Sequence, residues 1–457
     1  MEALSSMWWL LVALAVLVPI HEYGHYLAAR RCGVKVLRFS VGFGQPLFMR
    51  RDRHGTEWAI AWIPLGGYVR MLGEHELADR VEPVSDEERA QSHGSKSVGQ
   101  RMLISVAGPL ANFLLCIGLL WLMFVIGRPD YAPVAGKVEG LAASAGIRPG
   151  DTLLAIGDRE TPTWTEAGTE LIAAAVEGKP ASVRLRTADG ATVARTLDFS
   201  KLPADARLAK RFDAIGFTAR HQMPLPVVGT ILDGSAADGL LRPGDRILSI
   251  GGQPIATWDD IAPAVAGIGP AGGGPVEIER DGQRQSLQMR PKYGTPAGAR
   301  GDAAKPAWRL GIGPGEPPMD AMLRYGPLEA VPAALGETRY QLVQLFGMFR
   351  QAFAGRLAAG DTVSGPIGIA QVAKDYAQRG LAWYLSLLAM LSLSLAVLNL
   401  LPIPILDGGH LLYYLIELLK GRPLSERAMA AGQYVGLALV LGLMGLAFFN
   451  DLQRLIP

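Results

Sequence analysis

The sequence predicts a polytopic α-helical membrane protein with four transmembrane helices, a small membrane-associated β-sheet and two tandem extracytoplasmic α+β domains. Three observations lead to this fold class. Of the 457 residues, 49% are hydrophobic and 19% are charged, which is too apolar for an ordinary soluble protein and too charged for a chain confined to the bilayer. Four stretches are apolar and long enough to span a membrane. The region between the second and third stretches contains an internal repeat.

The four apolar stretches cover about residues 7–29, 102–126, 381–401 and 430–449. A spanning helix needs about 20 apolar residues, and each stretch reaches that length. The first stretch has no small-residue cleavage pattern and no positive charge at its start. We therefore interpret it as a retained span rather than a cleaved signal peptide.

Positive charges predict the orientation of these spans. Arginine and lysine are concentrated in residues 30–53 and again in residues 420–427. Because cytoplasmic loops are enriched in these residues, both loops are expected in the cytoplasm and both termini outside it. Residues 128–380 are then extracytoplasmic, which means periplasmic if the lipid bilayer is the inner membrane of a bacterium. The net charge of +2, with no basic stripe, indicates no nucleic-acid partner.

The internal repeat lies in the extracytoplasmic region. Each copy has a Pro-Gly-Asp turn followed by a short apolar run and a glycine, which is typical of a turn, a strand and a second turn. The spacing of the copies suits a small β-rich domain, so we place the two domains at residues 132–217 and 222–312. The copies are AGIRPGDTLLAIGD in residues 145–158 and GLLRPGDRILSIGG in residues 239–252.

The remaining segments complete the predicted organisation. Residues 1–131 form an N-terminal membrane region with a β segment on its cytoplasmic side, and residues 379–457 form a C-terminal membrane region. Residues 318–378 form an amphipathic helical region, because apolar residues recur there at helical spacing. Residues 56–63 are β-prone, and the Gly-Gly pair at 66–67 allows a tight turn before residues 68–71, which predicts a small hairpin-like sheet.

The strongest functional signal is His21-Glu22-Tyr23-Gly24-His25 in the first apolar stretch. On a helix, positions i and i+4 share one face, so both imidazoles can bind one Zn²⁺. Glu22 lies beside them and can act as the general base that takes a proton from the attacking water. Ionisable residues in a membrane span cost free energy unless they are paired or used, which disfavours a structural role for all three.

Two histidines leave a catalytic zinc one protein ligand short. Asp407 and His410 are the carboxylate and the imidazole that follow the third apolar stretch. Pro402 and Pro404 break the helix before them, and broken backbone at membrane depth must line a cavity or be satisfied by protein. Asp407 is the favoured third ligand, and His410 is the next candidate.

Polar residues near the first two spans have less specific interpretations. Cys116 is expected to be a packing residue, whereas Asn112 is either a packing residue or a hydrogen-bond partner near the site. Cys32 lies in an Arg-rich stretch beyond the first span. Because the chain has only these two cysteines, a disulfide framework is excluded and a cysteine-based zinc site is disfavoured.

The H-E-x-x-H of the first span, together with N-x-x-P and L-D-G in the third, resembles the site-2 protease family of intramembrane zinc metalloproteases. The resemblance implies that His21, His25 and Asp407 bind zinc. It also implies that Glu22 is the general base and that Asn399 orients the substrate backbone. No catalytic position departs from the family pattern. The resemblance covers essentially the whole chain and includes Gly42-Phe43-Gly44, residues 64–69, residues 108–112, the tandem repeats and residues 364–368.

The resemblance further implies the nature of the repeats and the partners. The repeats are expected to be PDZ-like domains that either bind extended peptides or, as we favour, exclude substrates with large ectodomains. The substrates are expected to be transmembrane proteins. An anti-sigma factor already trimmed by another protease, in regulated intramembrane proteolysis during an envelope stress response, is the first candidate. Remnant signal peptides are a further candidate class.

Cleavage of a transmembrane helix requires unwinding, because the helix holds its carbonyls in i→i−4 hydrogen bonds. The freed backbone groups need partners at membrane depth, and an exposed strand edge can supply them. Gly66, Gly67 and Tyr68 lie in the β-prone segment, where the glycines allow close backbone approach. We therefore predict that this segment presents the substrate to the zinc site.

Three other functions agree with parts of the sequence. A non-catalytic PDZ receptor or scaffold in the membrane would not need the intact zinc motif and Asp407. A metal transporter would be expected to have repeated membrane halves, and a serine protease to have a G-x-S-x-G or G-D-S-G stretch. The sequence has neither feature. It therefore favours an intramembrane protease with Zn²⁺ as its cofactor.

Overall fold

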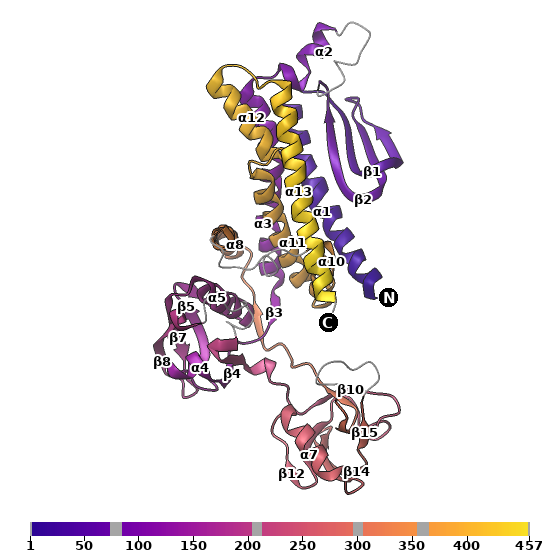
Figure 1. Cartoon of the computed structure of the whole chain (residues 1–457), viewed down its shortest axis with the longest axis vertical. Helices are drawn as coiled ribbons and strands as arrows, with labels where there is room; N and C mark the ends of the chain where they lie inside the picture. Colours follow the sequence, from indigo (N-terminus) through magenta and orange to yellow (C-terminus); the bar gives the residue numbers. More distant parts are fainter. Residues whose placement is uncertain (1, 74–84, 203–212, 296–304, 354–364, 456–457) are drawn as a thin grey trace. The chain divides into compact units, whose positions relative to one another are not determined.

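The computed structural model describes residues 2–73, 85–202, 213–295, 305–353 and 365–455. The chain divides into two compact units (Figure 1). The first, which we call the membrane unit, comprises Met1–Arg128 and Leu323–Pro457, and the second, the repeat unit, comprises Pro129–Met322.

Four helices of the membrane unit are long and apolar enough to cross a bilayer, and they coincide with the four apolar stretches predicted from the sequence. Local signals in the sequence set the ends of α3. It begins after a capping box of Ser97 and Gln100, and it ends at Gly127, whose φ of 92° favours glycine. The four helices are α1 (Glu2–Arg31), α3 (Val98–Ile126), α11 (Leu381–Leu400) and α13 (Glu426–Leu455).

The main hydrophobic core of the membrane unit lies among α1, α3 and α11. Cys116 and Leu120 of α3 are fully buried there beside Leu388 of α11. Ala13 of α1 and Ala389 of α11 are also buried, and such small residues let membrane helices approach closely. The packing role predicted for Cys116 is confirmed.

Two further helices occupy the segment between the repeat unit and α11. α8 (Ala330–Phe353) buries Ala334 and Thr338 and exposes Phe346. α10 (Pro366–Gln378) starts with a proline, which suits the first turn because that turn has no partner for the N–H. The other helices in the described part of the membrane unit are α2 (Asp86–Ala90), the 3₁₀ helix η1 (His93–Ser95) and α12 (Asp407–Lys420).

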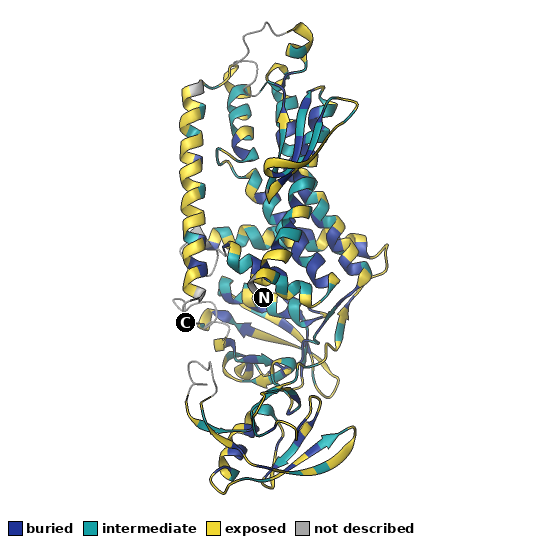
Figure 2. Cartoon of the chain, turned by 90° about the vertical axis from the view of Figure 1, so that its right-hand side faces the viewer, coloured by how far each residue is buried: buried dark blue, intermediate teal, exposed yellow. Residues whose placement is uncertain are grey.

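Most of α13 is exposed along its length (Figure 2). Near its C-terminal end, the buried side chain of Asp451 accepts hydrogen bonds from three backbone N–H groups at the start of α10. The donors are Gly365 at 3.0 Å, Ile367 at 2.9 Å and Gly368 at 3.2 Å. A carboxylate at this position satisfies free N–H groups and the positive end of the helix dipole. The contact joins α13 to α10.

Two long strands form the sheet of the membrane unit and pair with each other in more than one register. Residues 36–41 pair with residues 67–71, whereas residues 46–51 pair with residues 57–61. Residues 38–41 also pair with residues 57–60 on their other side. The first part of one strand therefore lies between the two ends of the other, and residues 67–71 lie at one edge of the sheet. The strands are β1 (Val36–Arg51) and β2 (Glu57–Met71).

The prediction of a tight turn at Gly66 and Gly67 is wrong. Both residues lie within β2, and neither has a positive φ. A Cβ on Gly66 would lie less than 3.0 Å from the ring of Phe43, so this glycine serves close packing rather than a turn. Within these two strands, positive φ occurs instead at Gly42 and Gly44 of β1, a strand that was not predicted from the sequence.

The repeat unit contains two four-stranded antiparallel sheets with the same strand order. In each sheet, the strand that follows the Arg-Pro-Gly-Asp turn has a two-residue strand on one side and a long hairpin on the other. Each sheet has its own buried core, which includes residues of α5 (Trp164–Glu177) or of α7 (Ile261–Ile268). The first sheet is β6 (Arg159–Glu160), β5 (Thr152–Ile156), β7 (Pro180–Arg186) and β8 (Thr192–Asp198); the second is β12 (Gln253–Pro254), β11 (Arg246–Ile250), β13 (Gly274–Arg280) and β14 (Gln283–Met289).

Short strands and helices complete the described elements. The strands pair as β4 (Ala135–Val138) with β9 (Phe217–Ala219), β10 (Val228–Ile231) with β17 (Ile312–Pro314), β15 (Lys292–Gly294) with β16 (Ala307–Arg309), and β3 (Arg128–Asp130) with β18 (Ala321–Leu323). The helices are α4 (Gly140–Ser144) and the 3₁₀ helices η2 (Phe199–Lys201), η3 (Arg220–Gln222) and η4 (Trp258–Asp260).

The two Arg-Pro-Gly-Asp turns share one feature and differ in another. In both, the buried aspartate accepts a hydrogen bond from the backbone N–H three residues earlier, at 2.9 Å for Asp151 and 2.8 Å for Asp245. Asp245 also forms an ion pair with Arg280 at 2.7 Å. Arg186 is the corresponding residue of the first copy, and it forms no ion pair with Asp151 in the described part of the chain.

Candidate metal and catalytic centre

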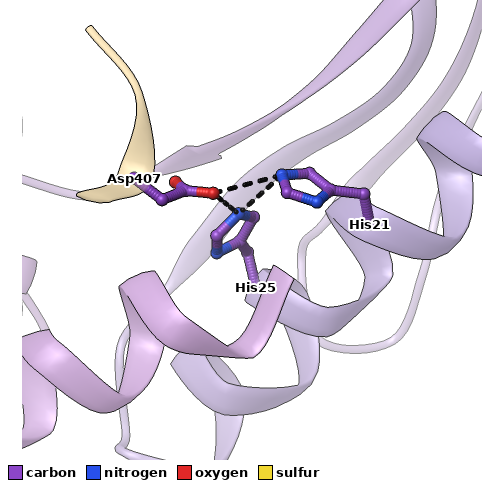
Figure 3. A group of neighbouring side chains, drawn as sticks. All are labelled: His21, His25 and Asp407. Carbon is purple, nitrogen blue, oxygen red and sulfur yellow. Dashed lines mark hydrogen bonds and ion pairs between the residues drawn. The ribbon is translucent and has the colours of Figure 1, made fainter. Parts of the chain in front are cut away.

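Three side chains from opposite ends of the chain meet in the membrane unit (Figure 3). α1 carries His21 and His25 one turn apart, and α12 begins with Asp407 directly after the proline-broken segment. Asp407 Oδ2 lies 3.2 Å from His21 Nε2 and 3.3 Å from His25 Nε2. The two Nε2 atoms are 3.3 Å apart.

These separations fit a zinc ion. Zinc bonds of about 2.0–2.1 Å directed to the corners of a tetrahedron place neighbouring ligand atoms about 3.3 Å apart. Two imidazole nitrogens and a carboxylate oxygen are ordinary zinc ligands, and three protein ligands are typical of a catalytic zinc site. No second group of this kind occurs among the residues that the structure describes.

The second ring nitrogen of each histidine faces a polar group of α3. His25 Nδ1 donates to the carbonyl of Ile104 at 2.8 Å, which leaves the Nε2 lone pair for a metal. His21 Nδ1 lies 3.3 Å from Asn112 Nδ2, while Asn112 Oδ1 is buried without a hydrogen-bond partner among the described residues. Reversal of the amide, whose orientation is assigned from hydrogen bonding, lets Oδ1 accept from Nδ1–H. Of the two interpretations of Asn112, the structure favours the hydrogen-bond partner.

Glycines bring α1 and α3 together at this point. A Cβ on Gly24 would lie less than 3.0 Å from the carbonyl of Ala107, and a Cβ on Gly108 would lie as close to the ring of His25. Larger residues at either position would force the two helices apart. Sequence reasoning assigned no role to these glycines, although both occur in stretches that it singled out.

Glu22 lies beside the sheet of the membrane unit. A Cβ on Gly67 would lie 3.3 Å from the Cγ atom of Glu22, and the backbone of Val69 forms a hydrogen bond with the Glu22 carboxylate. Tyr68, between them in sequence, stacks on Phe43 with the ring centroids 6.3 Å apart. The structure therefore brings the predicted β segment next to the predicted general base.

Two other candidates stay outside the cluster of donor atoms. Asn399 is half-buried near the end of α11, and its amide has no hydrogen-bond partner within the described ranges. His410 lies one turn beyond Asp407 on α12, is exposed, and packs near Tyr413 and Tyr414. Asp407, and not His410, meets the two histidines.

Residues 9–443 of the chain match the profile of peptidase family M50. The chain belongs to this family. Members of the family are the site-2 proteases, so the chain is a zinc-dependent protease of the membrane, as the sequence motifs indicated. The geometry of the histidine and aspartate side chains agrees with that membership.

Relatives match the chain over nearly its whole length. A Xylella fastidiosa (strain 9a5c) protein named as a zinc metalloprotease is 48% identical over 454 residues, which is 98% of each chain. Proteins named regulator of sigma-E protease RseP in Salmonella typhimurium (strain 14028s) and Escherichia coli (strain K12) are each 39% identical, over 99% of this chain and 100% of theirs. The predicted resemblance to the site-2 protease family is therefore confirmed, and within that family the chain is similar to RseP.

Proposed function

We propose that the chain is an intramembrane zinc metalloendopeptidase of the site-2 type. His21, His25 and Asp407 bind the ion, and Glu22 is the general base. One observation carries this proposal, namely that three zinc-type donor atoms converge, two of them from a helix that is long and apolar enough to cross a membrane and the third from α12. The close approach of the two Nε2 atoms, neither of which can donate to the other in the metal-ready tautomer, adds support.

The chemistry combines a metal with a carboxylate base. A bound zinc ion lowers the pKa of a coordinated water and polarises the scissile carbonyl. Glu22 accepts the proton of the attacking water and delivers it to the nitrogen of the leaving amine. The hydrogen bond from His25 to the Ile104 carbonyl keeps that imidazole in the tautomer with a free Nε2, and Asn112 does the same for His21.

The edge of β2 presents the substrate. Residues 67–71 pair on one side only, which leaves backbone groups for an added strand. Gly67 lies against the side chain of Glu22, so a peptide that follows this edge passes the general base. Gly66 and Tyr68 flank that point and pack on Phe43, which keeps the edge in place.

Asn399 orients the backbone of the substrate. Its amide offers both a donor and an acceptor. Within the described part of the chain neither is used, although the residue is half-buried. An unwound helix has free N–H and C=O groups that need such partners at membrane depth. Asn399 lies only a few residues before the segment that carries Asp407.

The repeats are PDZ-like domains, at residues 132–217 and 222–312, that exclude substrates with large ectodomains. The support is that each copy has a four-stranded sheet and a buried core of its own. Capture of an extended peptide along a strand edge is the alternative role for these domains. The remaining organisation follows the sequence, with residues 1–131, 318–378 and 379–457 on either side of the repeats.

The chain acts in the inner membrane of a bacterium, with both termini and the repeats in the periplasm and the zinc site towards the cytoplasm. The support is the concentration of positive charge in residues 30–53 and 420–427. Its substrates are transmembrane proteins. Because its relatives are named for the regulation of sigma-E, an anti-sigma factor is the first candidate substrate, and remnant signal peptides are the second.

Metal analysis of the purified full-length protein, alongside cleavage of a transmembrane model substrate, tests the proposal. Glu22→Gln is expected to keep its zinc and to lose cleavage by about 10²- to 10⁴-fold, because the base is removed and the ligands remain. Glu277→Gln, which changes an exposed carboxylate on β13, is the control and should match the wild type. Wild-type protein without zinc, or full cleavage by Glu22→Gln, would contradict the proposal.

A further inference from the structure

The turn that carries Asp407 has an unusual backbone. Ile405 has a φ of 105°, in a region that β-branched residues rarely adopt. Pro404 before it has no N–H, and the bonds within the turn are few: Ile403 donates to Leu401 and Leu406 to Ile403. Such a conformation persists only where the surrounding structure holds it.

Glycines of α12 pack against this turn from one side. A Cβ on Gly408 would lie less than 3.0 Å from the carbonyls of Leu400 and Leu401, and a Cβ on Gly409 would lie as close to Ile403. The first residues of α12 therefore rest directly on the backbone that precedes them.

Glycines of α13 also lie against this turn. A Cβ on Gly436 would lie less than 3.0 Å from the carbonyl oxygen of Pro404, which is backbone and cannot rotate away. Gly432 lies one turn earlier on the same face of α13, where a Cβ would meet the hydroxyl of Tyr413. Between these glycines and the buried C-terminal end, α13 is largely exposed, and a Cβ on Gly442 would meet nothing within 4 Å (Figure 2).

We propose that Gly436 and Gly432 are positioning residues for the catalytic centre. They let α13 lie directly on Pro404 and Tyr413, and this contact holds the turn so that Asp407 stays near both histidines. The inference rests on the proposed role of Asp407 as a zinc ligand. A methyl group at Gly436 can be accommodated only if α13 or the backbone of the turn moves. A methyl group at Gly432 meets the end of a side chain, so its effect is smaller.

Gly436→Ala in the full-length protein tests the larger effect. The chelator concentration that removes half of the zinc is expected to fall on the order of 10- to 100-fold, as when support of a metal ligand is lost. kcat is expected to fall on the order of 10- to 100-fold, because a small misplacement of a catalytic group is costly, while KM and Tm stay close to the wild type.

Gly442→Ala and Gly445→Ala are matched controls in the same helix. An added Cβ meets nothing within 4 Å at either position, and alanine is the better helix former. Both variants should retain zinc and kcat. If Gly436→Ala behaves as they do, the inference is overturned. A variant that was only less stable overall would lower Tm without a matching loss of zinc.

A double-mutant cycle at Gly432 gives an independent test. The hydroxyl of Tyr413 is buried without a hydrogen-bond partner in the described part of the chain, so Tyr413→Phe alone should change little. Gly432→Ala is expected to lower zinc retention and kcat a few-fold, and Gly432→Ala with Tyr413→Phe should recover them. Tyr413→Phe should not rescue Gly436→Ala. If Gly436→Ala does not accumulate, the cycle decides alone, and the absence of rescue overturns the inference.

Asp407→Asn in the same zinc assay separates this inference from the proposed function. Retention of zinc by Asp407→Asn would contradict the ligand assignment and the inference with it. Loss of zinc by Asp407→Asn, combined with full retention by Gly436→Ala, would leave the ligand assignment intact and overturn only the role of α13.

Discussion

Aspartates shielded from solvent occur in both units of the molecule, fully buried in the repeat unit and partly buried at Asp407, and they are satisfied in different ways. In the repeat unit, Asp151 and Asp245 accept hydrogen bonds from the backbone of their own turns, and Asp245 adds an ion pair with Arg280 from a paired strand. In the membrane unit, Asp407 faces His21 and His25, which come from the other end of the chain.

The two arrangements differ in where the groups that satisfy the aspartate come from. A turn aspartate is satisfied by N–H donors within a few residues, so a chain that makes the turn also completes it. His25 instead donates through Nδ1 to Ile104 and turns a lone pair towards the carboxylate of Asp407. A carboxylate and nitrogen lone pairs attract each other only through a cation or a proton. The arrangement within one turn therefore stabilises the fold, whereas the arrangement of distant residues is the one that we propose binds a metal.

The largest expected contrast, in zinc binding and in cleavage, is between replacing Asp407 in the membrane unit and replacing Asp245 in the repeat unit. Asp407→Asn is expected to weaken zinc binding by at least about 100-fold and to abolish cleavage, because an amide is a poor replacement for a charged ligand. Asp245→Asn should leave both unchanged. Zinc content and cleavage of a transmembrane substrate measure the contrast. If Asp407→Asn kept its metal and full activity, His410 would become the candidate third ligand.

Proline substitutions at the two edges of the membrane-unit sheet should also differ in their effect on cleavage. Tyr68→Pro removes an N–H and fixes φ at the edge near Glu22, so cleavage is expected to fall at least about tenfold while zinc stays bound. Phe48→Pro at the opposite edge is the control and should retain more activity. Substrates with Gly or Pro near the cut should be preferred, because their unwinding costs less. Equal cleavage by both zinc-loaded variants, with no such preference, would exclude the β2 edge from substrate presentation.

Removal of the repeats should change which substrates are cut rather than whether cleavage occurs. A chain without residues 132–312 is expected to cleave short substrates at the wild-type rate and to accept large ectodomains that the intact chain rejects. Rates for one transmembrane segment fused to ectodomains of increasing size measure this change. Loss of all cleavage, with normal zinc content and membrane insertion, would instead make the repeats an obligate receptor or a structural requirement.

The smallest expected effect is a difference in pH-dependent stability between the two repeat copies. Burial alone would raise the pKa of Asp245, but hydrogen bonds from Arg280 and from the Arg242 N–H hold it below its ordinary value. A lowered folded-state pKa gives stability that is present above about pH 3.9 and is lost as the pH falls below it. Arg280→Met should remove this contribution and lower amide protection in β11 and β13 on the order of tenfold at pH 7.

Arg186→Met is the matched control for that change, because Arg186 occupies the same place in the first copy without pairing to Asp151 in the described chain. Amide hydrogen exchange of the full-length protein, followed from neutral to acidic pH, compares the variants. Protection in β5 and β7 should be unchanged by Arg186→Met. Equal losses in the two copies would mean that the ion pair contributes nothing specific.

Features that depend on short stretches of sequence were determined by the sequence itself. Apolar length predicted four membrane-spanning helices, and the i, i+4 spacing of His21 and His25 placed both imidazoles on one face. The Pro-Gly-Asp turns led into strands as their composition indicated. Each of these outcomes depends mainly on residues within about one helix or one turn, and distant contacts did not override it here.

Only the tertiary structure decided which residues from distant segments meet. Asp407 and His410 were both candidates for the third ligand, and the packing of α12 brings Asp407 to the histidines. Asn112 and Gly436 lie on other helices, and nothing in their local sequence shows that they face His21 and Pro404. A glycine pair such as Gly66-Gly67 permits either a turn or a close contact, and the packing of neighbouring segments decides which of the two forms. Such contacts depend on how whole helices and strands pack, which local spacing does not specify.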